Sequence, residues 1–238
     1  MNKIKKIVVI VIIFLGWNIW NNTIYDSSEQ EIIEQIMFYL QGFKGFDKPC
    51  IGWILIHMPI QLYLSINMSR YLYNFSIYYY MKKGTIKKLW QEEIWISFKT
   101  AFSYYMIGLF CILLQMYSQE KLELLLSTSI LSIIQVCLIL ALSAVTFTFF
   151  VLLLECFTIN FQLAVSIAIV VQILMVMLSQ NIITGVLWYP LSHTDIRNQL
   201  MDKSFTNLLL QSIIEIIAVA VIGFVATKKR FEDLIGCV

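Results

Sequence analysis

The sequence predicts an all-α protein that crosses a membrane six times. Its 238 residues are 59% hydrophobic and only 13% charged, whereas an ordinary soluble domain carries about 25% charged residues. Apolar runs of membrane length recur along the chain, and a helix of about 20 residues spans the hydrocarbon layer of about 30 Å. Lys and Arg gather in only some of the gaps between these runs, which gives the protein an expected orientation.

The six expected spans follow the apolar runs, which only three prolines and nine glycines interrupt along the whole chain. The spans cover about residues 4–22, 51–71, 94–117, 122–154, 157–178 and 205–227. Pro59 lies inside the second span, where a kink is expected and tolerated. Ala164 and Ala168 form a small-x-x-x-small pair in the fifth span, a spacing that suits close contact with another helix. Because no internal repeat or linker divides the chain, residues 1–238 are expected to form one transmembrane domain.

The positions of the basic residues predict that both termini are cytoplasmic. Twelve of the 17 Lys and Arg residues fall on one side of the predicted spans, and the positive-inside rule assigns that side to the cytoplasm. They are Lys3, Lys5, Lys6, Arg70, Lys82, Lys83, Lys87, Lys88, Lys99, Lys228, Lys229 and Arg230. An even number of spans agrees with this assignment, since it returns both termini to the same side. The expected location is the cell membrane.

A short amphipathic helix is expected outside the membrane, between the first and second spans. It covers about residues 29–41, where Ile32, Ile36 and Leu40 recur at helical spacing with glutamates on other positions. Such a helix lies on the outer interface or caps the bundle.

A second short helix is expected in the cytoplasm, over about residues 85–93. Gly84 is a natural stop for the preceding helix, and Thr85 can cap a new one. Its apolar stripe includes Leu89 and Trp90, and its polar remainder is Lys87, Lys88, Glu92 and Glu93. We expect this helix to lie across the plane of the bilayer. The next cytoplasmic loop, 155–160, is expected to be a minimal turn.

No motif in the sequence indicates catalysis. A Gly-x-x-x-x-Gly-Lys-Ser/Thr phosphate loop is missing, so the chain is not expected to hydrolyse ATP itself. His57 and His193 are the only histidines, and no cysteine spacing is typical of a metal site. We therefore expect no catalytic residue, no metal and no cofactor in this chain, and we expect the histidines to be hydrogen-bonded or interfacial.

Glu215 is the most unusual single residue, because it lies near the middle of the sixth span. An acidic group at the centre of a membrane helix costs about 2.5–3.5 kcal/mol on insertion scales, so a partner or a wet cavity is expected. Gln211, one turn earlier, shares its face. The pair either lines a substrate path or bonds to a neighbouring helix and holds the bundle together. A third hypothesis is an ion or proton carrier that uses Glu215.

The layout resembles the permease subunits of type 2 ABC exporters. It combines six spans, two cytoplasmic termini, a large outer segment after the first span and a horizontal helix between the second and third. The stretch from Arg70 through Tyr78-Tyr79-Tyr80-Met81-Lys82-Lys83-Gly84-Thr85 to Leu89-Trp90 looks like the small permeases of Firmicute peptide exporters. Those include lantibiotic and bacteriocin immunity transporters and the exporter of phenol-soluble modulins. The composition, rich in Ile, Lys and Asn, fits a Gram-positive source.

The resemblance implies the permease subunit of an ATP-driven exporter of amphipathic or hydrophobic peptides. Its partners would be two copies of an ATP-binding subunit, which bind ATP and Mg²⁺, and a second permease that is either identical or a sister chain. The helix over 85–93 would be the coupling helix that docks on the ATPase, with contacts from Thr85, Lys87, Lys88, Leu89, Trp90, Glu92 and Glu93. The 155–160 turn would be a minor second contact, and residues 179–200 would match the outer gate helices. Membrane lipid is a further expected partner, and nucleic acid is not.

Two alternatives remain open from the sequence. The chain can be a stand-alone immunity or sensor protein that binds a peptide without transporting it. The helix over 85–93 can equally be an interfacial anchor without a partner. The identity of the peptide, and whether it is secreted or expelled for self-immunity, are not encoded in any motif of the chain.

Overall fold

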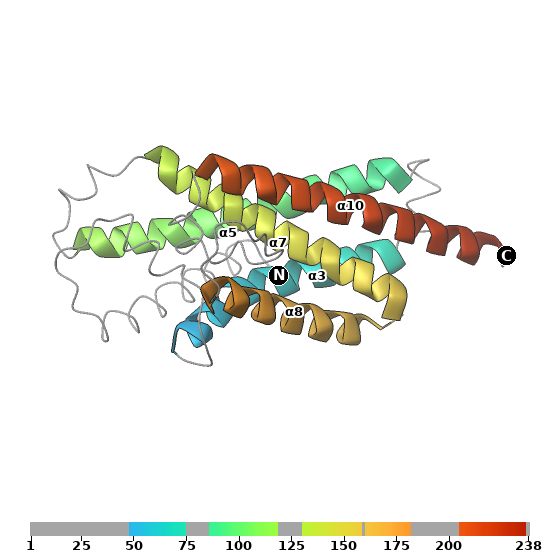
Figure 1. The fold of residues 1–238 in the computed structure, drawn as a ribbon. Coiled ribbons are helices and arrows are strands. Elements are labelled where there is room, and N and C mark those ends of the chain that lie inside the picture. Colours follow the sequence, from blue (N-terminus) through green and yellow to red (C-terminus); the bar gives the residue numbers. More distant parts are fainter. Residues whose placement is uncertain (1–47, 75–85, 119–129, 159, 182–204, 237–238) are drawn as a thin grey trace.

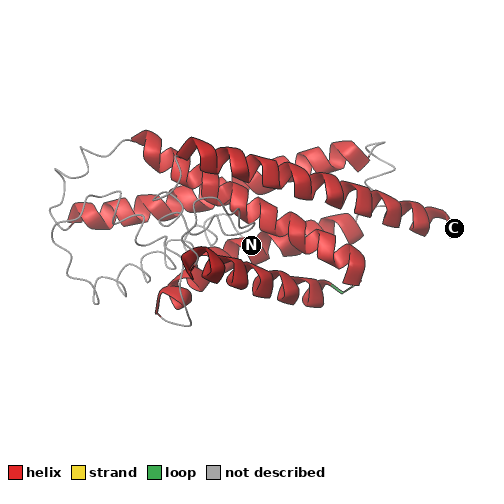
Figure 2. Ribbon diagram, in the orientation of Figure 1, coloured by secondary structure: helices red, strands yellow, loops and turns green. Residues whose placement is uncertain are grey.

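The protein is a bundle of long α-helices, seen here in a computed structural model that describes residues 48–74, 86–118, 130–158, 160–181 and 205–236. Figures 1 and 2 show the helices running side by side, with no strand in the described part of the chain. The helices are α3 (Lys48–Asn74), α5 (Ile86–Ser118), α7 (Ile130–Thr158), α8 (Phe161–Asn181) and α10 (Phe205–Gly236). The predicted all-α class is therefore confirmed for these residues.

Each of the five described helices is long and apolar enough to cross a membrane. Their apolar segments are Cys50–Arg70, Trp90–Cys111, Ile134–Thr158, Phe161–Leu178 and Asn207–Ala226. They correspond to the second to sixth predicted spans, so a multi-pass membrane protein is supported. The first predicted span (4–22), the outer amphipathic helix (29–41) and most of the segment 179–200 lie outside the described residues. The count of six and the cytoplasmic termini stay predictions.

Helix α7 forms the centre of the bundle. Figure 1 shows it between α10 and α8, and α3, α5, α8 and α10 all pack against it. In its apolar segment 78% of the residues are buried inside the protein, against 22% in α8 and in α10. A helix that is apolar on every face, as α7 is, has no side that prefers water. The outer faces of α8 and α10 are correspondingly rich in exposed Ile, Leu and Val, as lipid-facing surfaces are.

The small-residue pair of α8 is used inside the chain. Ala164 and Ala168 are both fully buried and pack with Phe147 and Val151 of α7. Two small methyl side chains one turn apart let the large aromatic ring of Phe147 approach the α8 backbone. The predicted close contact is therefore the α7–α8 interface. On α3, the helix continues through Pro59 without interruption.

The structure differs from the sequence-based expectation at residues 85–93. Instead of a short horizontal helix followed by a span, α5 is one uninterrupted helix of 33 residues from Ile86 to Ser118. Between Ile86 and Leu109 the chain contains only one glycine, Gly108, and no proline, so nothing stops the helix at the membrane surface. The charges that suggested a boundary mark where the helix leaves the apolar layer, and they do not mark where it ends.

The turn between the fourth and fifth spans is also shorter than expected. Helix α7 continues to Thr158, so Glu155 lies in its last turn and not in a loop. The next helix begins at Phe161, directly after Asn160. The Asn160 side-chain oxygen Oδ1 accepts hydrogen bonds from the backbone amides of Gln162 and Leu163, at 2.9 and 3.3 Å. Asn160 is thus the N-cap of α8, and it explains why the fifth span begins there and not at 157.

Candidate functional site

The most distinctive feature of the bundle is the way in which α3 and α5 meet. They are held together by two tyrosine hydrogen bonds in one half of their length. The Tyr104 hydroxyl donates to the Ile56 backbone carbonyl at 2.8 Å, and the Tyr105 hydroxyl lies 3.0 Å from His57 Nδ1. These rings are buried, and Trp53 packs beside His57 at a centroid distance of 5.6 Å. We call these two contacts the tyrosine clamp.

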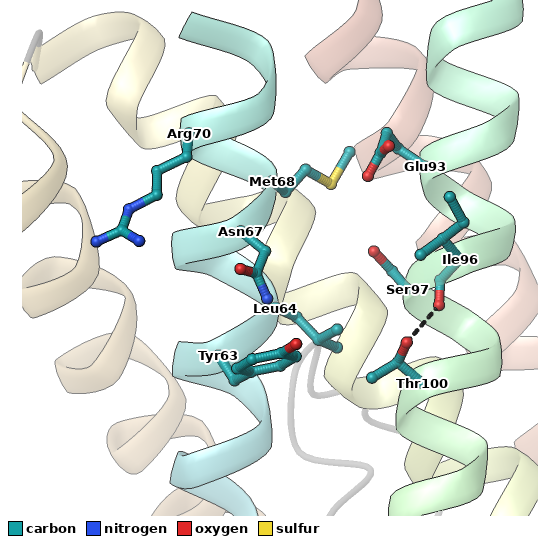
Figure 3. Close-up of a pocket in the computed structure, with 9 residues that line it drawn as sticks. All are labelled: Tyr63, Leu64, Asn67, Met68, Arg70, Glu93, Ile96, Ser97 and Thr100. Carbon is teal, nitrogen blue, oxygen red and sulfur yellow. Dashed lines mark hydrogen bonds between the residues drawn. The ribbon is translucent and has the colours of Figure 1, made fainter. Parts of the chain in front are cut away.

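Away from the tyrosine clamp, α3 and α5 separate and leave a cleft of about 450 Å³ between them. Figure 3 shows the side chains that line it, from α3 on one side and α5 on the other. They are Tyr63, Leu64, Asn67, Met68, Arg70, Glu93, Ile96, Ser97 and Thr100. The volume falls in the range of roughly 300–1,000 Å³ that is typical of small-molecule sites.

We call this cleft the α3–α5 cleft. Its polar groups form two rows, one on each helix, with the same residue intervals. Tyr63, Asn67 and Arg70 follow one another along α3 at intervals of four and three residues. Glu93, Ser97 and Thr100 have the same intervals on α5. Residues at these spacings share one face of a helix, so each helix presents one polar row. Leu64, Met68 and Ile96 stand between the polar groups and make the lining amphipathic.

The two charged residues of the cleft differ in burial and direction. Glu93 is buried, at 7% exposure, and its carboxylate points toward α3 beside Met68 (Figure 3). Arg70 is exposed, and in the same view its guanidinium extends away from Glu93. Thr100 donates its hydroxyl hydrogen to the Ile96 carbonyl at 2.8 Å, a local bond that ties it to its own helix.

One turn before Glu93, Trp90 anchors the beginning of α5 to the rest of the bundle. Its indole stacks on Phe149 of α7 at a centroid distance of 5.0 Å and meets Phe224 of α10 edge-on at 6.2 Å. A Cβ atom at Gly223 would lie 3.0 Å from Trp90 Cη2, so a side chain there would require the ring to shift. The indole Nε1 is buried without a hydrogen-bond partner in the described structure, so packing holds this side chain in place. We call Trp90, Phe149, Gly223 and Phe224 the Trp90 wedge.

The length of α5 indicates where the cleft lies in the membrane. A helix of 33 residues is about 50 Å long, which exceeds the hydrocarbon layer of about 30 Å by about 13 residues. All charged residues of α5 fall within its first 14 positions, so part of this surplus is at its N-terminal end. Lys99 closes this charged segment, with its Nζ 4.7 Å from the centre of the exposed Trp95 ring, a pairing typical of the membrane interface. The α3–α5 cleft therefore begins at the interface and extends into the apolar layer.

A further polar contact joins α3 to α7 near the cleft. The Ser69 hydroxyl donates to Glu155 Oε1 at 3.0 Å, and both side chains are buried. Hydrogen bonding to a carboxylate is stronger than bonding between neutral groups, so this contact fixes the ends of the two helices. The sequence placed Glu155 in a turn, and nothing in the pattern around Ser69 indicated that the two would meet.

The structure brings together only some of the residues predicted to contact an ATPase. Trp90 and Glu93 are buried in the bundle and the cleft, respectively, and Glu92 is half-buried. Lys87, Lys88 and Leu89 lie in the first turn of α5, and Thr85 lies outside the described residues. Trp90, which we expected on the stripe of a horizontal helix, instead packs between α7 and α10.

Glu215 and Gln211 do not line the α3–α5 cleft. Glu215 is buried on α10, on the same stripe as Leu208, Ser212 and Gly223, and α10 packs against α7. The Ser212 hydroxyl donates to the Leu208 carbonyl at 2.9 Å. This placement favours the hypothesis that Glu215 holds helices together, and the substrate-path hypothesis stays untested.

Most of the cleft was not predicted from the sequence. Its lining includes polar or aromatic side chains inside spans, none of which is unusual by itself: Tyr63, Asn67, Ser97 and Thr100. The shared spacing of four and three residues on both helices was the available signal. It becomes meaningful only when α3 and α5 are known to be neighbours.

Among the described residues, no cluster of His, Cys, Asp and Glu is suited to hold a metal ion. Comparison of the chain with protein-family models, with curated proteins and with solved structures gave no match. The arguments for function therefore rest on the cleft, the Trp90 wedge and the membrane topology.

Proposed function

We propose that this protein is the transmembrane permease subunit of an ATP-driven ABC exporter that moves amphipathic or hydrophobic peptides out of the cell or its membrane. In this proposal two copies of a separate ATP-binding subunit supply ATP and Mg²⁺, and a second permease, identical or a sister chain, completes the transporter. The transporter would lie in the cell membrane of a Gram-positive bacterium.

The observation that carries the proposal is that the first turns of α5 both line the α3–α5 cleft and pack against the centre of the bundle. Glu93 and Ser97 line the α3–α5 cleft, while Trp90, one turn away, is wedged against α7 and α10. A force on the cytoplasmic end of α5 would therefore reach both the cleft and the centre of the bundle. Levers of this kind transmit rigid-body motion between subunits.

The lining of the α3–α5 cleft supports an amphipathic cargo. Leu64, Met68 and Ile96 offer apolar surface, and hydroxyl, amide and carboxylate groups stand among them. Its position between two helices gives access from the lipid, where amphipathic molecules accumulate. Sugars and ions do not match the apolar side of this lining.

In this mechanism, ATP binding closes the ATPase dimer and displaces the docked end of α5. Lys87, Lys88 and Glu92 would provide the contacts with the ATPase, since Trp90 is occupied inside the bundle. The tyrosine clamp holds α3 and α5 together at the other end, so this displacement changes the width of the cleft. Cargo would be released when the cleft narrows.

The decisive experiment is co-purification of the chain with an ABC ATP-binding subunit encoded beside it. We expect a complex whose ATP hydrolysis rises when an amphipathic peptide is added. The double substitution Lys87→Glu and Lys88→Glu should abolish this stimulation, with Lys99→Glu, about three turns further along α5 and beside Trp95, as the matched control. A chain that forms no complex and leaves ATP hydrolysis unchanged contradicts the proposal.

A second candidate is a stand-alone immunity or sensor protein that binds a peptide without transport. The α3–α5 cleft alone would suffice for this role, because binding needs no lever. Peptide binding that survives the charge reversal of Lys87 and Lys88, in a cell without any adjacent ABC ATPase gene, favours this candidate.

A further inference from the structure

The α3–α5 cleft lies at the depth of the membrane where lipid head groups give way to acyl chains. Arg70 is the last residue of the apolar segment of α3, so it stands at the membrane interface. On the same row of α3, Asn67 lies about 4.5 Å deeper and Tyr63 about 10 Å deeper, at a rise of about 1.5 Å per residue. The cleft therefore extends from the interface into the hydrocarbon layer by about two helical turns.

The charge that the cleft offers to a ligand is that of Arg70. Its side chain is exposed, its guanidinium extends away from Glu93 (Figure 3), and it has no hydrogen bond or ion pair among the described residues. Glu93, in contrast, is 7% exposed and already has an interaction of its own. A guanidinium group presents its N–H donors in one plane and can hold a phosphate through two of them at once. The interfacial end of the cleft is therefore suited to a phosphate group.

The groups further along the cleft suit the ester and acyl parts of a lipid. Asn67 of α3 and Ser97 of α5 stand between the charged end and the Tyr63 end (Figure 3). Their amide and hydroxyl groups can donate hydrogen bonds to ester carbonyl oxygens. Leu64 and Ile96 add apolar surface for a hydrocarbon chain. Phosphate, ester and chain follow one another in the same order in a phospholipid of the adjacent leaflet.

We infer that the α3–α5 cleft binds an anionic phospholipid, with its phosphate at Arg70 and one acyl chain against Leu64 and Ile96. Basic pockets between membrane helices are typical sites for the head groups of such lipids. An anionic head group is favoured because a zwitterionic one would bring an ammonium group close to the Arg70 guanidinium. This inference goes beyond the proposed function, since the lipid would occupy the cleft whether or not the chain joins an ATPase.

The experiment measures lipid binding to the full chain by native mass spectrometry from detergent micelles. Phosphatidylglycerol and phosphatidylcholine with identical acyl chains are the probes, so that only the head group differs. We expect the first phosphatidylglycerol to bind about fivefold more tightly than the first phosphatidylcholine, as one basic residue at the membrane surface provides. Equal affinities of the two lipids for the unmodified protein overturn the inference.

Arg70→Gln removes the charge and keeps a long polar side chain. It should lower the affinity for phosphatidylglycerol about fivefold and leave the affinity for phosphatidylcholine nearly unchanged. Lys99→Gln is the matched control, because Lys99 is also an exposed basic residue near the interface but does not line the cleft. If the two variants have the same effect, the lipid is attracted by basic residues in general and the site is not at Arg70.

A second pair of variants tests whether the acyl chain lies in the cleft. Asn67→Trp places a large ring in the cleft from an exposed position of α3, so the fold should tolerate it and the binding of both lipids should weaken. Leu174→Trp, on the exposed apolar face of α8, is the control and should change neither affinity. Undiminished binding of phosphatidylglycerol to Asn67→Trp would place the lipid outside the cleft.

A competition experiment separates a lipid from a soluble phosphate ligand. Glycerol 3-phosphate carries a phosphate group without acyl chains, and we expect that it does not displace phosphatidylglycerol. Displacement would assign Arg70 to a soluble phosphate and overturn the inference. Lipid selectivity that depends on Arg70, in a chain that joins no ATP-binding subunit, would reject the proposed exporter and leave the inference intact. A complex with the ATPase but no lipid selectivity would do the reverse.

Discussion

At the scale of single residues, the bundle contains polar side chains with very different surroundings. His57 is bonded to Tyr105 and Ser69 to Glu155, so their burial is compensated. The Gln61 side chain, one turn from His57, is fully buried, and neither its Oε1 nor its Nε2 has a hydrogen-bond partner in the described structure. A buried amide left unbonded costs about 1–3 kcal/mol, so this residue weakens the bundle.

Replacing Gln61 by Met should therefore stabilise the protein by about 1–3 kcal/mol, since the new side chain fills the same space without an unpaired polar group. Thermal unfolding in detergent, followed by tryptophan fluorescence, measures the shift. Gln162→Met, at an exposed position of α8, is the control and should change the midpoint little. A lower midpoint for Gln61→Met would mean that the amide is bonded in the membrane.

The Trp90 wedge gives a second prediction at this scale. Gly223→Leu should destabilise the protein by about 1–3 kcal/mol, because even a Cβ atom at this position would meet the indole at 3.0 Å. Ala218→Leu, on the exposed face of the same helix, should have little effect. The same unfolding assay compares the two variants. Coupling between Gly223→Ala and Trp90→Phe in a double-mutant cycle would confirm that the two residues contact each other, and strict additivity would argue against the wedge.

At the scale of helices, the tyrosine clamp determines how α3 and α5 can move relative to each other. Both helices pack on α7, and the hydrogen bonds of Tyr104 and Tyr105 add direct links between α3 and α5. Motion that opens or narrows the α3–α5 cleft must then pivot near these tyrosines.

The double substitution Tyr104→Phe and Tyr105→Phe tests this arrangement. Each lost hydrogen bond should cost about 0.5–1.5 kcal/mol, and the distance between the helices should become less well defined. Spin labels on cysteines that replace Asn67 and Thr100 report this distance by electron paramagnetic resonance. We expect a broader distance distribution than in the protein with both tyrosines; an unchanged distribution would mean that α7 alone sets the spacing.

The sequence predicted the helices better than it predicted their neighbours. Apolar runs located all five described spans, because hydrocarbon solubility depends mainly on local composition. The helix break expected before residue 94 is not present, since charge marks the membrane surface, while helix continuity depends on the lack of a proline between Ile86 and Ser118. The cleft could not be predicted, because Asn67 and Ser97 become one site only through the pairing of α3 with α5. The hydrogen bond between Ser69 and Glu155 could not be predicted either, because it depends on the pairing of α3 with α7.

At the scale of the whole molecule, the proposed function depends on which side of the membrane the first turns of α5 face. The cleft and the first turns of α5 serve a cytoplasmic ATPase only if the α7–α8 turn is also cytoplasmic, since α5 and α7 are consecutive described spans. Asn160 and Phe157 are exposed at that turn and offer a point of access.

Accessibility labelling in intact cells provides the test. In a cysteine-free background, Lys87→Cys and Asn160→Cys should react with a membrane-impermeant maleimide only after the cells are opened, because the positive-inside rule places both in the cytoplasm. Leu174→Cys, on the exposed apolar face of α8, is the lipid-facing control and should stay unreactive throughout. Reaction of either cytoplasmic position in unopened cells would reverse the orientation.

The central place of α7 also has a consequence for biosynthesis. Ribosomes make α3 and α5 before α7, so both enter the bilayer without the surface on which they eventually pack. Until residue 158 has been inserted, the pair lacks its α7 contacts and depends on direct contacts such as those of Tyr104 and Tyr105, and Glu155 is not yet available to Ser69. A chain interrupted before α7 would leave the α7-facing surfaces of two helices, with Ser69 among them, exposed to lipid, which is the kind of unassembled intermediate that membrane quality control removes.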